Sequence, residues 1–154
     1  MRKEKYELPP EAIREMIINA HCHRNILDES CIQVAIYDRL EVTSPGGLYN
    51  GLTYEEVMNG HSKIRNKGIA NIFSQMGLIE AWGSGIKRIL NAAEKYVLPK
   101  PRIQEFDNMF RVELFRKNSL TKRERIDFID ELELGRRRDG ESSEKGRRRI
   151  AILN

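Results

Sequence analysis

The spacing of apolar residues predicts a helix near the N-terminus. Pro9 and Pro10 are typical of a helix start, and Glu11 suits a first turn. Apolar side chains then recur every three or four residues, at Ala12, Ile13, Met16, Ile17 and Ala20. Four of the six residues in 25–30 are polar, so we expect this helix to end before a loop.

A period of two follows and predicts a β-hairpin. Apolar residues alternate along the first strand at Ile32, Val34 and Ile36. Asp38-Arg39 predicts a tight turn. The second strand places Leu40, Val42 and Ser44 on one face, and Glu41 and Thr43 on the other. Pro45, Gly46 and Gly47 end this strand, so we expect a hairpin with one buried face.

Helical spacing returns in the second half of the body. Thr53 and Glu56 form a capping box that predicts a short helix through Met58. After a polar connector, the patterns of 69–76 and 86–93 predict two more helices, and Phe110–Phe115 predicts a final strand. We therefore expect an α/β (α+β) fold, a two-layer sandwich with helices on one face of a small mixed or antiparallel sheet.

Composition places the chain among globular, charged proteins. Its 154 residues are 40% hydrophobic and 32% charged. No apolar run has the length of a membrane span, and the N-terminus lacks a signal-type apolar region. Cys22 and Cys31 give no disulfide framework and no metal-binding pair. We therefore expect a cytoplasmic protein with free thiols and no membrane partner.

The net charge of +4 belongs to the C-terminal tail. From Arg116 onward there are 12 Lys and Arg against 8 Asp and Glu, and the first 115 residues carry 15 of each. A neutral body argues against a broad phosphate-binding face on the main domain.

Glu15 and Asn19 are the first candidate functional residues. They lie four residues apart and share one face of the predicted helix. An amide oxygen can ligate Mg²⁺, and a carboxylate can orient or deprotonate a water molecule. The pair therefore suits a nucleotide site, with a polar stripe at the edge of a packed helix as the alternative.

A glycine-rich turn, Gly83-Ser84-Gly85, leads directly into a predicted helix. Free N–H groups and the positive end of the helix dipole make such a start suitable for phosphate. A plain turn with Ser84 as the N-cap explains the same residues. Neither a Walker P-loop nor a dinucleotide-binding glycine motif occurs in the chain.

The order of these elements resembles the GHKL ATPase superfamily, which includes gyrase-type ATPases, histidine kinases and MutL. More narrowly, residues 8–115 resemble the C-terminal nucleotide-binding-like domain of the RecG-like transcriptional regulators. The segments that carry the narrower resemblance are PPEAIREMIINAHCHRN, IQVAIYDRLEVTSPGGL, GHSKIRNKGIANIF, GLIEAWGSGIKRI and FRVEL.

The resemblance implies ATP and Mg²⁺ as cofactors and assigns roles to individual residues. Glu15 would be the general base, Asn19 the Mg²⁺ ligand, and His23 a neighbour of the nucleotide. A first glycine box near adenine and ribose would comprise Ser44, Gly46 and Gly47. A second, which cradles phosphates, would comprise Gly83, Ser84 and Gly85. The connector 60–68 stands where the superfamily has a mobile ATP lid.

The first glycine box departs from the superfamily pattern. Ser44 stands where an aspartate accepts the adenine amino group, and Leu48 replaces the second glycine. Loss of a charge-assisted hydrogen bond weakens binding by about 1.5–3 kcal/mol. The expected function is an ATP-binding or nucleotide-sensing module of a DNA-associated transcriptional regulator, and Mg-dependent ATPase activity if it is an enzyme. The alternative is an interaction or dimerisation module that keeps the fold without nucleotide.

The resemblance also bears on the ends of the chain. We expect a nucleotide-binding domain over 1–117, and over 118–154 a basic helix with a mostly disordered tail. Relatives often continue into a winged helix, so this second part is interpreted as a truncated one and the chain as a fragment or truncated member. DNA would then be contacted through a missing domain or the basic tail, and a homodimer is a further expectation.

Overall fold

The computed structural model of the protein describes residues 6–79 and 84–119. Its contacts divide the chain after Ser119. Gly83 lies outside the described residues, as does all but the first two residues of the basic helix and tail expected over 118–154.

Four antiparallel strands form one sheet in the order β1-β2-β4-β3. The strands are β1 (Gln33–Ile36), β2 (Arg39–Pro45), β3 (Arg102–Phe106) and β4 (Met109–Phe115). In the central pair, Val42 of β2 lies opposite Val112 of β4. Of the mixed or antiparallel sheet expected, the antiparallel form is found, and it contains β3, a strand that the apolar pattern had not predicted.

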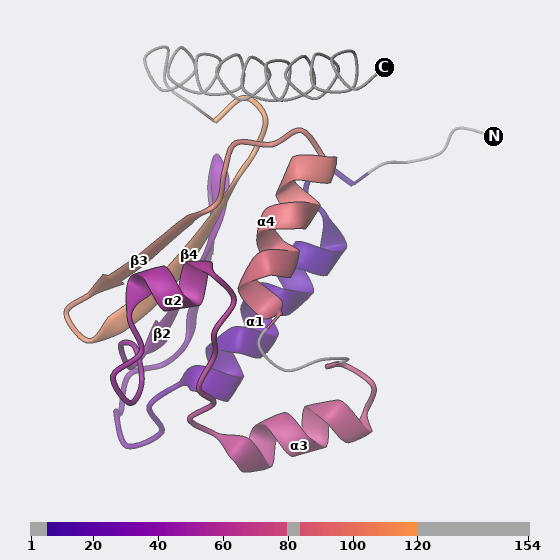
Figure 1. The fold of residues 1–154 in the computed structure, drawn as a ribbon. Helices are drawn as coiled ribbons and strands as arrows, with labels where there is room; N and C mark the ends of the chain where they lie inside the picture. The colour runs from indigo at the N-terminus through magenta and orange to yellow at the C-terminus, as the bar shows by residue number, and fades with distance from the viewer. Residues whose placement is uncertain (1–5, 80–83, 120–154) are drawn as a thin grey trace, which may run out of the picture. The chain divides into compact units, whose positions relative to one another are not determined.

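Two helices cover one face of this sheet (Figure 1). They are α1 (Pro10–His23) and α4 (Gly85–Lys95), which lie side by side. Their apolar faces meet the inner face of β2 and β4 in one core, which includes Ala12, Met16, Ala20, Leu40, Val42, Ile89, Val112 and Leu114. The two-layer α/β sandwich expected from the sequence is therefore confirmed.

Two shorter helices follow β2 in the chain. Helix α2 (Tyr54–Met58) begins with the expected capping box between Thr53 and Glu56. Helix α3 (Lys67–Gln75) packs against the end of α1 through a small second cluster built on Ile18, Cys22 and Ala70. The side chain of Asn66, at the start of α3, donates to the carbonyls of His21 and Arg24 at 3.0 and 2.7 Å. This anchors the connector between α2 and α3 to the end of α1.

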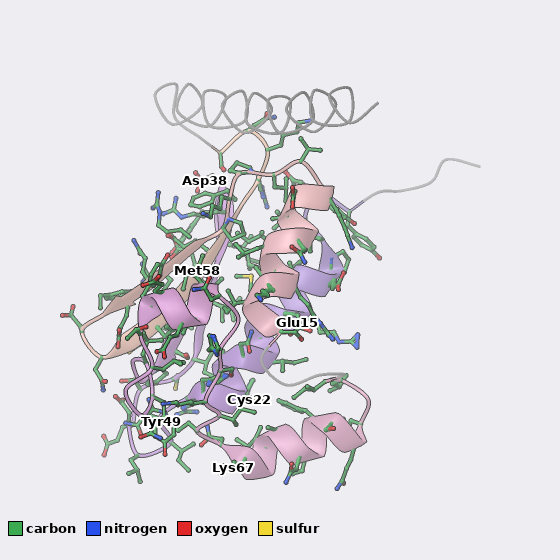
Figure 2. The ribbon with its side chains drawn as sticks, viewed as in Figure 1. Glu15, Cys22, Asp38, Tyr49, Met58 and Lys67 are labelled. Carbon is green, nitrogen blue, oxygen red and sulfur yellow. The ribbon has the colours of Figure 1, made fainter. Side chains whose placement is uncertain are left out.

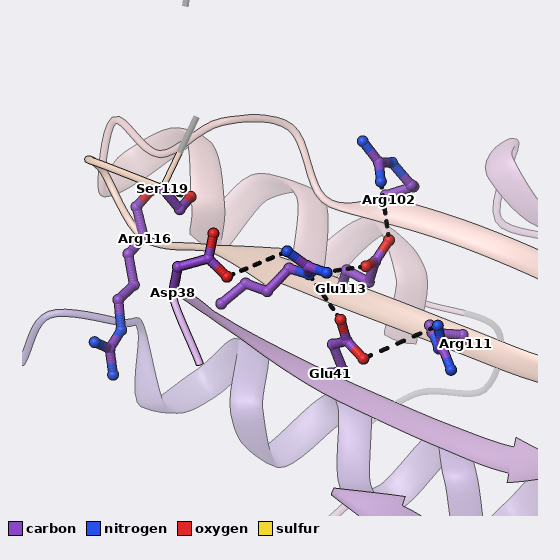
Figure 3. Close-up of polar contacts among 8 residues, drawn as sticks. Asp38, Glu41, Arg102, Arg111, Glu113, Arg116 and Ser119 are labelled. Atoms are coloured by element: carbon purple, nitrogen blue, oxygen red, sulfur yellow. Dashed lines mark hydrogen bonds and ion pairs between the residues drawn. The ribbon is translucent and has the colours of Figure 1, made fainter. Parts of the chain in front are cut away.

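The opposite face of the sheet carries a network of arginines and buried carboxylates (Figure 3). Arg39 donates to Glu41 at 2.7 Å and to Glu113 at 3.0 Å. Arg102 lies 3.5 Å from Glu113, and Arg111 lies 3.9 Å from Glu41. Strand β2 is therefore buried on both faces, and the expectation of a hairpin with one buried face is wrong. Long arginine side chains cover the carboxylates on the face where the sequence alone suggested solvent.

None of the helices within 6–79 and 84–119 is long and apolar enough to cross a membrane.

Candidate functional site

A pocket opens between α1, the glycine turn after β2, the connector before α3 and the first turn of α4. Its cavity volume is about 90 Å³, and it opens to solvent. Most of its wall is apolar, with Ile18, Leu52, Val57, Ile64, Ile86 and Phe110 among the lining residues. A mostly apolar wall with a few convergent polar groups is typical of small-molecule sites.

Helix α1 contributes the polar stripe of this pocket. Glu15, Asn19 and His23 follow one another at intervals of four residues and all line it. Figure 2 shows Glu15 and Cys22 on α1, with Glu15 beside α4. The spacing that suggested a shared helix face in the sequence therefore brings these side chains to one cavity.

The predicted glycines come to the same pocket from distant parts of the chain. Gly46, Gly47 and Gly85 line it together with the α1 stripe. Ser44 is buried within β2 and Ser84 precedes α4, and neither is among the lining residues. Six of the nine predicted site residues are thus brought together, while Gly83 lies outside the described residues.

Asn19 has an unsatisfied donor at the start of α4. Its Nδ2 atom is buried and has no hydrogen-bond partner among the described residues. A Cβ atom built on Gly85 would lie 2.5 Å from that Nδ2. Since buried polar groups are nearly always paired, Asn19 and the helix start form a place for an acceptor such as a phosphate oxygen.

Glu15 is engaged by α4 as well. Its carboxylate accepts a hydrogen bond from Arg88 at 2.9 Å, and both side chains are largely buried. The charge of Glu15 is therefore paired within the protein before any ligand binds. Sequence patterns did not indicate this partner, because Arg88 lies 73 residues away in the chain.

The backbone donors of the first glycine turn are already used. Gly46 N–H donates to the Asn108 carbonyl at 2.7 Å, and Gly47 N–H donates to Asn108 Oδ1 at 3.3 Å. Leu48 N–H donates to Glu105 at 2.8 Å. Gly46 has φ +104°, a conformation that suits glycine. This turn is thus a pocket wall held by the β3–β4 hairpin, and these three donors face protein acceptors.

The connector is also tied to this wall. Arg65 Nη2 donates to the Gly47 carbonyl at 2.8 Å, and its guanidinium lies 4.8 Å from the ring centre of Tyr49. Lys63 donates to the Asn50 carbonyl at 2.8 Å. Lys63 and Arg65 both lie in the connector 60–68, where the resemblance implied a mobile ATP lid. They hold carbonyl oxygens of the segment after β2, and their role could not be found from the sequence because a basic loop residue usually reaches solvent.

Burial sets the protonation of two groups in the pocket wall. Desolvation lowers the pKa of His23 below its ordinary 6.5, a hydrogen bond with the Lys63 backbone opposes this in part, and nearby Arg65 lowers the pKa further. His23 is therefore mainly neutral at pH 7 in the pocket wall. Desolvation, with Glu15 nearby, raises the pKa of Cys22 to about 11, so its thiol is protonated at neutral pH.

The neutral state of His23 predicts a pH dependence of stability. Because the folded pKa lies below 6.5, the unfolded chain binds more protons as the pH falls past that value, and the free energy of unfolding decreases. We expect urea midpoints to fall between pH 7.5 and pH 5, and His23→Gln to reduce this slope. His21→Gln, an exposed position on the same helix, is the matched control and should keep the wild-type slope.

A metal could not be held here by a cluster of acidic or imidazole ligands. Among the described residues, no three His, Cys, Asp or Glu side chains gather as a metal site. Mg²⁺ commonly takes one or two protein oxygens and completes its shell with water and substrate phosphates. The amide oxygen of Asn19 could supply one such protein ligand.

The two-layer fold is that of a GHKL-like domain. More particularly, the chain belongs to the family described as "Putative ATP-dependent DNA helicase recG C-terminal", whose model matches residues 29–114. The match begins after α1 and does not include Glu15 and Asn19. Their assignment to the site depends on the geometry of the pocket.

A solved structure extends this relationship. The crystal structure of the DIP2311 protein from Corynebacterium diphtheriae is similar, with a TM-score of 0.68 and 28% sequence identity. The similarity covers 75% of this chain and 25% of that one, so this chain spans about a quarter of the solved protein's length. No curated protein matches the chain.

Proposed function

We propose that the domain binds Mg-ATP in this pocket and acts as a nucleotide-sensing module. The observation that carries the proposal is the buried, unpartnered Nδ2 of Asn19, set against the glycine that starts α4. A phosphate oxygen at this point would satisfy the donor and lie on the positive end of the helix dipole. The family membership supports the same class of ligand.

In this proposal Asn19 is the residue that would hold Mg²⁺. Its amide oxygen would contact the ion while the amide nitrogen meets a phosphate oxygen. The bound ion would neutralise charge on the phosphates. Gly85 leaves the space that this side chain occupies, since any larger residue would displace it.

Hydrolysis is a weaker candidate than binding. A general base must be free to accept a proton from water, and Glu15 is held by Arg88 at 2.9 Å. The ion pair instead fixes Glu15 and α4 in one arrangement. A nucleotide that shifted α4 would change this pair, which is the kind of change a sensing module reports to its neighbours.

At the adenine end of the proposed site, Ser44 stands where the superfamily has an aspartate. Ser44 is only 2% exposed and does not line the cavity, so its hydroxyl does not stand in for the missing aspartate. The apolar residues of the wall would then hold the base mainly by contact. Because one charge-assisted hydrogen bond is lost, we expect a dissociation constant for ATP of about micromolar to millimolar.

Thermal unfolding with and without Mg-ATP tests the proposal. At a concentration about 100 times the dissociation constant, a ligand stabilises the folded state by about 2.7 kcal/mol. We expect the melting temperature of the wild type to rise with Mg-ATP, and Asn19→Ala to weaken binding at least tenfold. Asn71→Ala, an exposed asparagine on α3, is the control and should respond as the wild type. A wild-type protein that shows no shift with Mg-ATP or Mg-ADP would refute nucleotide binding.

The wider setting of the module is part of the same proposal. We infer that it serves a DNA-associated transcriptional regulator, with 1–117 as the nucleotide domain and 118–154 as a basic appendage. The support is the resemblance of the motifs and the positive charge from Arg116 onward. If the appendage contacts DNA, removing residues 120–154 should abolish salt-dependent binding to a duplex.

A further inference from the structure

Among residues 6–79 and 84–119, no strand pairs with the outer edge of β1. Strand β1 occupies one end of the strand order, and three of its four residues are exposed. Val34 is 53% exposed and Ile36 is 65% exposed, and Tyr37 just beyond them is 62% exposed. Edge strands that remain unpaired usually carry a charged residue, a proline or a bulge. The sequence Gln-Val-Ala-Ile of β1 has none of these.

The other edge of the sheet is protected in the ordinary way. Pro99 and Pro101 precede β3, and the strand itself carries Arg102 and Glu105. Prolines and charges at an edge oppose pairing with another chain. Among the described residues, the β3 edge therefore carries prolines and charges that oppose pairing, and β1 carries neither.

The backbone N–H and C=O groups that face outward from β1 belong to its apolar residues Val34 and Ile36. Tyr37 N–H donates to the Arg39 carbonyl at 2.8 Å across the turn. Hydrogen-bonded positions alternate along an antiparallel pair, so Tyr37, Ala35 and Gln33 direct their backbone groups toward β2. Val34 and Ile36 then direct theirs outward. Their side chains lie on the helix side of the sheet, because they are opposite Val42 and Leu40 of the core.

We propose that this edge pairs with β1 of a second copy of the chain, which makes a continuous eight-stranded sheet. The strand is free of charge, so two antiparallel copies bring no like charges together. In the proposed register the outward backbone groups pair with each other: Val34 faces Ile36 of the other copy, and Ala35 meets its own counterpart on the twofold axis. This contact is isologous and closes at two copies.

The register makes the most direct test a disulfide. Ala35 lies at the non-hydrogen-bonded position on the axis, where Cα atoms of facing strands are about 4.5 Å apart and a disulfide can form. In a background where the exposed Cys31 is replaced by serine, Ala35→Cys should cross-link the full chain to a dimer under mild oxidation. Asn71→Cys in the same background, exposed on α3, should remain monomeric.

Sedimentation supplies the second measurement. A four-residue strand pair is smaller than a standard interface, so the wild type should pass from monomer to dimer over about 1–300 µM. Val34→Lys should shift this transition at least tenfold to higher concentration, and Ile72→Lys, a similarly exposed isoleucine on α3, should not. A wild type that stays monomeric throughout, or cross-linking no greater at Ala35→Cys than at Asn71→Cys, would overturn the proposal and leave the edge to a different chain.

Discussion

Replacing Gly85 by alanine is expected to weaken Mg-ATP binding at least tenfold with little loss of stability. The added Cβ would lie 2.5 Å from Asn19 Nδ2 and 2.9 Å from its Oδ1. The amide at the end of a side chain can move away, so the fold survives while the proposed contact to phosphate and metal is displaced. Titration calorimetry gives the affinity, and urea unfolding gives the stability.

Gly68→Ala is the matched control for this change. Gly68 is also near the start of a helix, yet a Cβ there meets nothing within 4 Å. Alanine favours a helix over glycine by about 1 kcal/mol, so this variant should be at least as stable as the wild type and should bind equally. If Gly85→Ala binds Mg-ATP as tightly as Gly68→Ala, the position of the Asn19 amide is irrelevant to the ligand.

Removing the guanidinium of Arg39 is expected to cause the largest loss of stability among the surface arginines. Arg39→Ala would take a partner from two carboxylates at once, and Glu113 is only 3% exposed. Breaking a fully buried pair costs about 3–5 kcal/mol. Arg39 is one-third exposed, and Arg102 and Arg111 remain nearby, so we expect about 2 kcal/mol in urea unfolding.

Arg116→Ala provides the comparison for Arg39→Ala. Arg116 lies 3.6 Å from Glu7, and the carboxylate of this pair is mostly exposed. Exposed pairs contribute about 0–1 kcal/mol. Equal losses from the two substitutions would show that Glu41 and Glu113, on the sheet face opposite the helices, do not depend on Arg39.

Local patterns predicted the parts of the site that sit on regular structure. The four-residue spacing of Glu15 and Asn19 placed both on one face of α1, and both line the pocket. The capping box of Thr53 and Glu56 also formed as expected. These features depend on residues three or four positions apart, so the sequence contains all the information they need.

Features that depend on tertiary structure were missed. Strand β3 has one buried apolar residue, Ile103, and forms because β4 offers it a partner. Arg88 pairs with Glu15, and Arg65 holds the Gly47 carbonyl, across long stretches of chain. A single sequence shows charge and polarity at such positions and gives no indication of which residues they meet.

Asn108 has two roles, because it forms the turn between β3 and β4 and also accepts hydrogen bonds from the glycine turn after β2. It stands in a two-residue turn with φ +58°, a conformation that glycine adopts more easily than any other residue. Its carbonyl and its side chain also hold Gly46 and Gly47. Glycine at this position would relax the turn and at the same time remove one support of the pocket wall, so local turn preference and ligand-site geometry oppose each other at this one residue.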